Sequence, residues 1–155
     1  MTLAVGDSAP DFTLPSSGGD PVTLSKLHAG KTVVVFFYPK DDTPGCTVEA
    51  CGFRDRYESF VEAGAEVVGI SSDSISSHEQ FVQKHGLPMT LLSDVDGKVR
   101  AAFGVKATLG LFPGRATFVI DQTGVVRHVF VSQLRAGAHV DEALSVVKQL
   151  TPKRP

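Results

Sequence analysis

The chain has 155 residues, of which 42% are hydrophobic and 21% are charged, and its formal net charge is −2. This length and composition fit one globular domain with a full core, and they exclude a disordered chain. The near-neutral charge, without a long basic run, argues against nucleic acid as a partner. The longest apolar run, residues 33–38, is far shorter than the roughly 20 residues of a membrane-spanning helix, so no membrane partner is expected.

In the first half of the chain we predict a hairpin, a central strand and a long helix. In chain order they cover residues 9–14 paired with 22–24, residues 33–38 and residues 44–63. Two short β-prone runs around a loop rich in Gly, Pro and Ser indicate the hairpin, and the continuous β-branched and aromatic run is typical of a strand covered on both faces. Gly64 stands where a helix terminator belongs. The helical period rests on Cys51, Tyr57, Phe60 and Val61.

In the second half, strands and helices continue to alternate. We predict, in order, a strand over residues 66–71, a helix over 76–85, a strand over 90–93, a helical turn over 99–103, strands over 116–121 and 125–131, and a helix over 140–150. The last two strands flank the turn Gln122-Thr123-Gly124 and should form an antiparallel hairpin. Residues 151–155 are expected to fray. The alternation predicts an α/β fold in a single domain over residues 1–155.

The N-terminal residues MTLAVGDSAPDF contain neither a basic leader nor an apolar region of about 7–15 residues, so we expect no secretory signal. A cytoplasmic setting is the expectation that follows. Two cysteines are too few for a disulfide scaffold, and a close pair in a reducing compartment is more often catalytic or redox-active than structural. Cys46 and Cys51 are therefore the first candidate functional residues.

Cys46 lies where the long helix is expected to begin. Thr43 is a favoured N-cap residue and Pro44 suits the first helical position, so Cys46 takes the third. Its sulfur should lie near the unpaired N–H groups of the first turn, where a helix carries roughly half a positive charge. Cysteines in such places have pKa values of about 3.5–7.5 instead of about 8.5. We therefore expect Cys46 to be largely thiolate, which is the nucleophilic form.

Cys51 follows five residues later, and on an intact helix the two Cα atoms would be about 8–9 Å apart and about 140° apart around the axis. A disulfide needs a Cα separation of about 4.4–6.8 Å, so the first turns would have to unwind before the bond forms. The spacing therefore indicates a switch with two conformations. It lacks the C-x2-C pattern of zinc sites, which argues against a metal. Two inert buried thiols are the alternative.

The residues around Cys46 resemble a known family. Pro39-x-x-x-Thr43-x-x-Cys46 is similar to the active-site pattern of peroxiredoxins, and KDDTPGCTVEACGFRD resembles the peroxiredoxin Q group, also called bacterioferritin comigratory proteins. The resemblance continues through GDSAPDFTL, GISSDSISSHEQF, HGLPMTLLSDVDGKV, RATFVID and VVRHVF. It implies a thioredoxin-like fold, with a central mixed β-sheet flanked by helices and an N-terminal β-hairpin. It also implies reduction of hydrogen peroxide and organic hydroperoxides, with Cys46 as the peroxidatic and Cys51 as the resolving cysteine.

Three further site residues follow from the resemblance. Thr43 would orient the peroxide through its hydroxyl, Pro39 would shield the pocket from water, and Arg115 would complete the site. A guanidinium suits this place because attack by a thiolate on an O–O bond moves negative charge onto the leaving oxygen. The chain departs from the family pattern at Ala116 and over residues 106–114, which concerns the rim of the pocket. Rivals for the site arginine are Arg54, Arg56, Arg100 and Arg127.

Other polar residues are weaker candidates. Glu49 is similar to a residue that recurs in the family, but an acid in the first turns of a helix is also favoured by the dipole alone. We interpret Lys40, Asp41 and Asp42 as a solvated loop. No glycine-rich phosphate loop or metal-ligand pattern is found, so no cofactor and no metal are predicted. The histidines, interpreted as structural or surface residues, are His28, His78, His85, His128 and His139.

The sequence therefore predicts a thiol peroxidase of the atypical two-cysteine kind. The Cys46 thiolate attacks the peroxide and becomes a sulfenic acid, Cys51 of the same chain condenses with it, and an external dithiol restores both thiols. By resemblance the reductant is thioredoxin, and we expect a cytoplasmic monomer. Two alternatives stay open: a general thiol–disulfide oxidoreductase, although that class usually employs C-x-x-C, and a non-catalytic redox sensor whose unwound helix recruits a partner.

Overall fold

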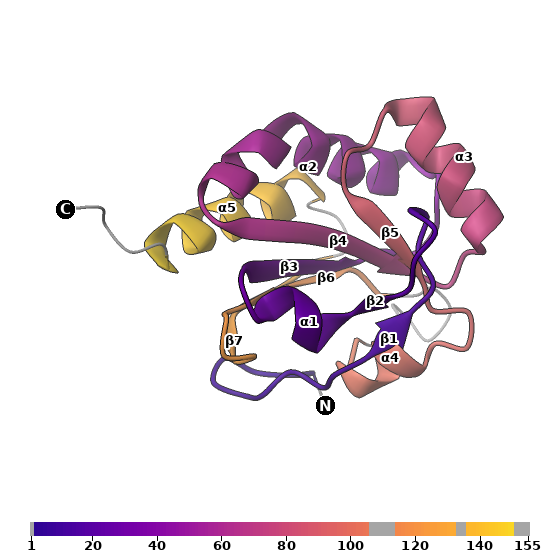
Figure 1. The fold of residues 1–155 in the computed structure, drawn as a ribbon. Coiled ribbons are helices and arrows are strands. Elements are labelled where there is room, and N and C mark those ends of the chain that lie inside the picture. Colours follow the sequence, from indigo (N-terminus) through magenta and orange to yellow (C-terminus); the bar gives the residue numbers. More distant parts are fainter. Residues whose placement is uncertain (1, 106–113, 133–135, 151–155) are drawn as a thin grey trace.

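The computed structural model describes residues 2–105, 114–132 and 136–150. A mixed five-stranded sheet in the order β5-β4-β3-β6-β7 forms its centre (Figure 1). β3 runs parallel to β4 and antiparallel to β6, and β6 and β7 form the predicted antiparallel hairpin. The strands are β3 (Thr32–Phe37), β4 (Ala65–Ser71), β5 (Thr90–Ser93), β6 (Ala116–Ile120) and β7 (Val126–Val131).

β3 is the central strand, and all of its residues are buried. Val34 and Phe36 join the apolar core on one face of the sheet, whereas Val33, Val35 and Phe37 join the core on the other face. A strand covered on both faces has no solvent side, and this explains its continuous apolar sequence.

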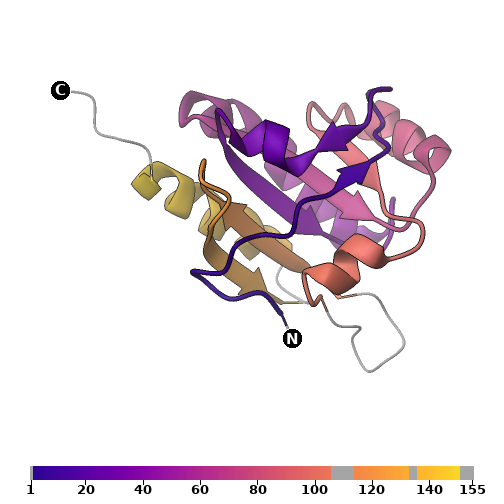
Figure 2. The ribbon, with the colours of Figure 1, turned by 60° about the horizontal axis from the view of Figure 1, so that its bottom comes forward.

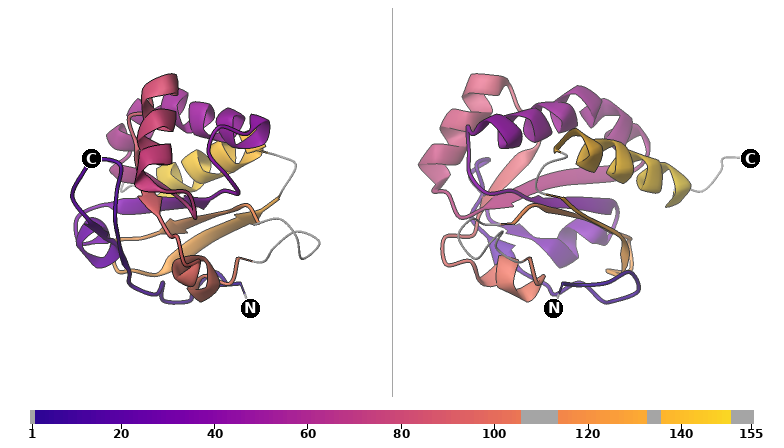
Figure 3. Two further views of the ribbon diagram at one scale, coloured as in Figure 1. Left: turned by 90° about the vertical axis from the view of Figure 1, so that its right-hand side faces the viewer. Right: turned by 180° about the vertical axis from the view of Figure 1, so that it is seen from behind.

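Helices cover one face of the sheet, and a thinner layer covers the other (Figures 1 and 3). Figure 2 shows the thinner layer in front of the sheet. The arrangement confirms the predicted mixed sheet with flanking helices and an N-terminal hairpin. The helical layer contains α2 (Pro44–Glu62), α3 (Ile75–His85) and α5 (Ala136–Leu150). The thinner layer contains α1 (Leu24–His28), α4 (Lys98–Ala102) and the antiparallel pair β1 (Thr13–Leu14) and β2 (Val22–Thr23).

Apart from shifts of element ends, such as β1 beginning at residue 13 instead of residue 9, three details differ from the sequence prediction. Leu24 begins the short helix α1 instead of ending a strand. The sequence did not indicate this helix, because five residues are too few to show a helical period. α5 begins at Ala136, earlier than the predicted residue 140. Val61 is 49% exposed, so the buried face of α2 runs through Phe53 and not through Val61.

Two predictions fall on parts of the chain that the structure leaves out. Residues 106–113, where the sequence departs from the family pattern, and residues 151–155, the predicted frayed tail, lie outside the described residues. The single domain over residues 1–155 stays a prediction. Within the described ranges, no helix has the length and apolarity that crossing a membrane requires.

The sheet order brings together the two chain segments that carry the predicted site. The chain leaves the C-terminal end of β3 after Phe37 and enters α2 a few residues later. Arg115 directly precedes β6, whose first residue, Ala116, pairs with Phe37. The first turn of α2, with Cys46, and Arg115 therefore meet at the same edge of the sheet.

Candidate active site

Cys46 is the third residue of α2, as the sequence predicts, and it is only 1% exposed. Pro44 occupies the first helical position and Thr43 the N-cap. The Thr43 hydroxyl donates to the Lys40 carbonyl at 2.9 Å and caps no N–H group of the described helix. The N–H groups of the first turn therefore keep their partial positive charge for the sulfur.

Arg115 joins Cys46 to Glu49. Its Nη2 donates to Cys46 Sγ at 3.3 Å, and its Nη1 donates to Glu49 Oε1 at 2.7 Å. Burial acts to lower the pKa of Arg115, but the neighbouring Glu49 and Cys46 outweigh burial and raise this pKa. Gly45 permits the close approach, because a Cβ at this position would lie 3.0 Å from Arg115 Nη2. The guanidinium is therefore a permanent positive charge held against the sulfur.

The rival arginines have other partners, and in the described structure none of them bonds to Cys46. Arg100 donates from Nη1 to the Gly114 carbonyl at 2.7 Å and from Nη2 to the Tyr38 carbonyl at 2.9 Å. It thereby ties the residue before Arg115 to the end of the central strand. Sequence reasoning missed this clamp because its partners are backbone carbonyls far away in the chain. The rivals in exposed ion pairs are Arg54, Arg56 and Arg127.

Glu49 is fully buried beside Arg115, so the helix dipole alone does not explain it. Burial raises the pKa of Glu49 to about 8, although Arg115 opposes this shift. Glu49 Oε2 lies 3.5 Å from Nδ1 of His139, a fully buried residue of α5. Burial lowers the pKa of His139 to about 4. This histidine belongs to the surroundings of the site, and no spacing in the sequence indicated that.

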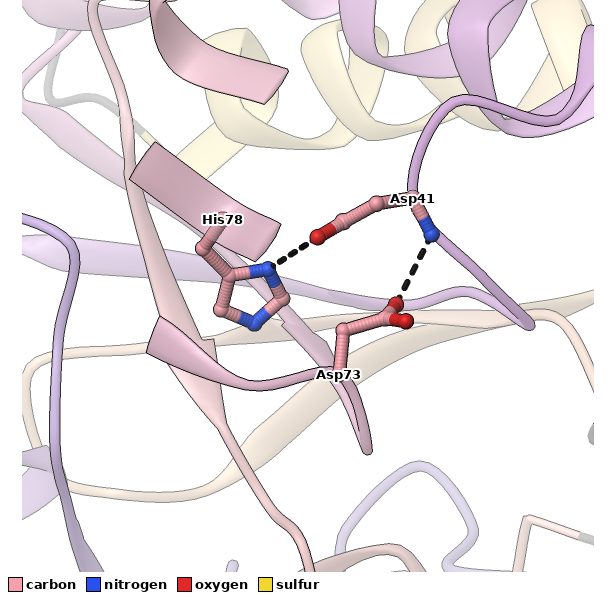
Figure 4. A group of neighbouring side chains, drawn as sticks. All are labelled: Asp41, Asp73 and His78. Atoms are coloured by element: carbon pink, nitrogen blue, oxygen red, sulfur yellow. Dashed lines mark hydrogen bonds and ion pairs between the residues drawn. The ribbon is translucent and has the colours of Figure 1, made fainter. Parts of the chain in front are cut away.

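The loop between β3 and α2 is held by a buried polar network (Figure 4). Asp41 is 7% exposed, so the prediction of a solvated loop is wrong at this position. Its carboxylate accepts from Tyr38 Oη at 2.5 Å and from Ser77 Oγ at 2.8 Å, and lies 2.7 Å from His78 Nδ1. The Asp41 backbone N–H donates to Asp73 Oδ2 at 2.8 Å. The network fixes the loop against α3 and the end of β3.

The same network contains the described side chains that come closest to a metal site. The oxygen and nitrogen atoms of Asp41, Asp73 and His78 lie within 4.8 Å of one another. These atoms already have hydrogen-bond partners, and His78 Nε2 lies 2.9 Å from the Leu92 carbonyl, which requires a proton on that nitrogen. The arrangement fits a hydrogen-bonded anchor for the loop.

The other charged residues of the loop, Lys40 and Asp42, are exposed as predicted. Asp42 has a left-handed backbone, with φ of 59°, and its carboxylate accepts from Lys84 Nζ at 2.7 Å. His85 Nε2 lies 3.2 Å from the same carboxylate. Lys84 and then His85 lower the pKa of Asp42, so the exposed side of the loop is also tied to α3.

Cys51 is half-buried on the same helix as Cys46, and both are free thiols. Because α2 is continuous from Pro44 to Glu62, helix geometry separates the two Cα atoms by about 8–9 Å, beyond the reach of a disulfide. The structure therefore represents the dithiol form, with the helix intact.

Pro39, the residue expected to shield the pocket, is half-buried where the chain leaves β3.

Known proteins resemble this chain over most of its length. Residues 5–129 match the model of the AhpC/TSA family. Peroxiredoxin Q, chloroplastic, of Sedum lineare is 53% identical over 146 residues, which cover 94% of this chain and 78% of the relative. Peroxiredoxin Q, chloroplastic, of Suaeda salsa is 53% identical over 149 residues, which cover 96% of this chain and 69% of the relative.

Solved structures show the same fold. Peroxidoxin BcpB of Mycobacterium tuberculosis has a TM-score of 0.88 at 42% identity, covering 96% of this chain and 98% of that chain. A bacterioferritin comigratory protein of Xanthomonas campestris, described for its alkyl peroxide reduction activity, has a TM-score of 0.82 at 36% identity, covering 91% of this chain and 92% of that chain.

The curated relatives contradict the expectation of a cytoplasmic setting, because they are named chloroplastic. The localisation of a protein depends on targeting segments, and the residues that form the core and the site carry no information about it. Family membership, in contrast, is recognised from the core and site residues themselves. Agreement in sequence over nearly the whole chain, and in fold, means that this chain belongs to the AhpC/TSA family, in its peroxiredoxin Q group.

Proposed function

We propose that this chain is a thiol peroxidase that reduces hydrogen peroxide and organic hydroperoxides through Cys46. The observation that carries the proposal is the 3.3 Å hydrogen bond from Arg115 Nη2 to the buried Cys46 Sγ at the start of α2. A permanent cation and a helix N-terminus both stabilise a thiolate relative to a thiol. The alkyl peroxide reduction activity of the Xanthomonas campestris relative supports organic hydroperoxides as substrates.

In the first step, Cys46 Sγ attacks the terminal oxygen of the hydroperoxide, the O–O bond breaks, and the sulfur becomes a sulfenic acid. The bonding electron pair leaves with the other oxygen, which takes a proton from water and departs as alcohol or water. Arg115 stabilises the negative charge on that oxygen. The Thr43 hydroxyl, which donates to the Lys40 carbonyl, accepts a hydrogen bond from the peroxide through its oxygen. Pro39 shields the pocket from water.

In the second step, the Cys51 thiol attacks the sulfenic sulfur, the disulfide forms and water leaves. The first turns of α2 unwind for this step, because the intact helix holds the two cysteines too far apart. An external dithiol then reduces the disulfide and is itself oxidised, and we assign thioredoxin to this role. Both cysteines lie on one helix of one chain, so a monomer suffices.

Stopped-flow measurement of hydrogen peroxide consumption tests the proposal. With thioredoxin and its reductase supplied, the wild-type protein should consume many equivalents, whereas Cys46→Ser should consume none. Cys51→Ser should react once and then stop, because its sulfenic acid has no partner in the chain. A wild-type protein that also stops after one equivalent would be a redox sensor. Reduction of disulfide substrates without consumption of peroxide would indicate a general oxidoreductase.

A further inference from the structure

Arg115 faces two acids with a single positive charge. It donates to Cys46 Sγ from Nη2 and to Glu49 Oε1 from Nη1, and these three residues are at most 4% exposed. A thiolate and a carboxylate together would leave this buried group with a net negative charge, which a low-dielectric interior disfavours. Arg100 also acts on Cys46, but its donors are held by the Gly114 and Tyr38 carbonyls. Cancelling the charge of Glu49 would therefore leave the bonded cation, Arg115, to the Cys46 thiolate.

His139 has the geometry to cancel it. Its Nε2 lies 2.8 Å from the Ser132 carbonyl, and because a carbonyl only accepts, this nitrogen carries a proton. Its Nδ1 lies 2.7 Å from Thr117 Oγ1 and 3.5 Å from Glu49 Oε2. Glu49 Oε2 is buried and has no hydrogen-bond partner among the described residues. A proton between Oε2 and Nδ1 gives this oxygen a partner, and the Thr117 hydroxyl can donate to a bare Nδ1 or accept from a protonated one.

We propose that Glu49 and His139 hold one proton between them, so that the pair is neutral and the charge of Arg115 is left to the Cys46 thiolate. A protonated Glu49 beside a neutral His139 has the same net charge as an ionised Glu49 beside an imidazolium. His139 acts through Glu49 and Arg115, and it is therefore a positioning residue. The proposal rests on the proposed function, because it assumes that Cys46 works as a thiolate.

The environment favours the arrangement with the proton on the carboxyl. Burial raises the pKa of Glu49 to about 8 and lowers the pKa of His139 to about 4. Among the described residues, Arg115 at the start of β6 acts on both members of the pair, Cys46 on α2 accepts from Arg115, and Arg100 on α4 acts on Cys46. Figure 3 shows α5, which carries His139, running beside α2 in the layer over the sheet.

The pH midpoint of thiolate formation at Cys46, read from thiolate absorbance in a Cys51→Ser background, tests the proposal. Glu49→Gln replaces a neutral carboxyl by a neutral amide of the same shape, so the midpoint should move by less than about 0.3 pH units. If Glu49 were an uncompensated carboxylate, removing it would free Arg115 and lower the midpoint by about one unit or more. That result would overturn the proposal.

His139→Gln gives the complementary test. Without the imidazole, the protonated Glu49 carboxyl loses Nδ1 as the acceptor for its proton and ionises at a lower pH, so it competes for Arg115 and the midpoint should rise by up to about one unit. In the double variant His139→Gln with Glu49→Gln, the pH midpoint should return to its value in Glu49→Gln. If the two changes were purely structural defects, their shifts of the midpoint would add. His128→Gln on β7, whose side chain is 27% exposed and pairs with Glu142, is the matched control and should shift nothing. An unchanged midpoint in His139→Gln would reject the proposal.

A measurement on the unsubstituted pair keeps the test valid if a variant fails to fold. Isotope-edited NMR of the Glu49 carboxyl carbon and the His139 ring nitrogens at pH 7 should find one shared proton, on one residue or the other. An ionised Glu49 beside a neutral His139 would overturn the proposal. Such a result combined with normal peroxide turnover would reject the shared proton alone. Midpoints as expected without peroxide consumption would instead reject the proposed function.

Discussion

Arg115 differs from a lysine in the number and direction of its donors, since two of its nitrogens hold two different side chains. Lysine would keep the charge but could not bond to Cys46 and Glu49 in these directions. We therefore expect Arg115→Lys to slow the stopped-flow reaction with hydrogen peroxide by about 10²-fold while the protein stays folded. Arg127→Lys, in an exposed pair with Asp121, is the control. If Arg127→Lys were the damaging change, Arg115 would not be the site arginine.

Gly45 tests the same contact from the other side. An alanine Cβ would lie 3.0 Å from Arg115 Nη2, so the guanidinium that bonds to Cys46 would have to give way by a few tenths of an ångström. Because alanine favours a helix by up to about 1 kcal/mol, Gly45→Ala should not lower the free energy of unfolding in urea. The peroxide reaction should nevertheless slow by about tenfold or more. Gly30→Ala, where a Cβ would meet no described atom within 4 Å, should leave the rate unchanged.

At the scale of elements, the proposed mechanism requires α2 to change during turnover. Its first turns hold both cysteines in a continuous helix, and the disulfide is incompatible with that helix. Hydrogen exchange should therefore be faster in the disulfide form than in the dithiol form over about residues 44–53, and β3 should stay protected in both. Equal protection of residues 46–53 in the two forms would mean that an external thiol, and not Cys51, resolves Cys46.

The loop that leads into α2 depends on its anchor in α3. Removing His78 would take away the Nδ1 partner that lies 2.7 Å from the buried Asp41 carboxyl, and leaving a buried polar group short of a hydrogen bond costs about 1–3 kcal/mol. His78→Leu should therefore lower the free energy of unfolding in urea by that amount. His85→Leu removes an exposed partner of Asp42 on the same loop, and it should cost no more than about 1 kcal/mol. Equal losses in both variants would remove the special role of Asp41.

At the scale of the molecule, unwinding of α2 disturbs one of the two cores that meet at β3. Phe53 stacks on Phe36 with ring centroids 4.5 Å apart, and loss of a buried phenylalanine costs about 3–5 kcal/mol. A disulfide that closes so short a loop stabilises the folded protein by only about 2 kcal/mol. The oxidised protein should therefore unfold at a temperature at least about 3 °C lower than the reduced protein. Cys51→Ser should show no such redox dependence, and an oxidised form of equal or higher stability would contradict the expected extent of unwinding.

Local patterns determined the order of the elements and the place of the nucleophile. A continuous apolar run indicates the buried strand β3, and Pro44 and Gly64 mark the two ends of the long helix α2. These signals lie within a few residues of the structure they specify, so a single sequence carries them. The motif around Cys46 carried the family in the same way.

The tertiary structure decided which side chains surround that nucleophile. Arg115 meets Cys46 across 69 residues of sequence, and Glu49 meets His139 only because α5 packs beside α2. The sequence predicts a solvated loop at Asp41, but in the fold α3 packs against this residue and buries it. Such contacts are set by the order and register of the strands, and no local spacing encodes them. The sequence by itself therefore determined where Cys46 lies, and only the fold decided which charged groups it meets.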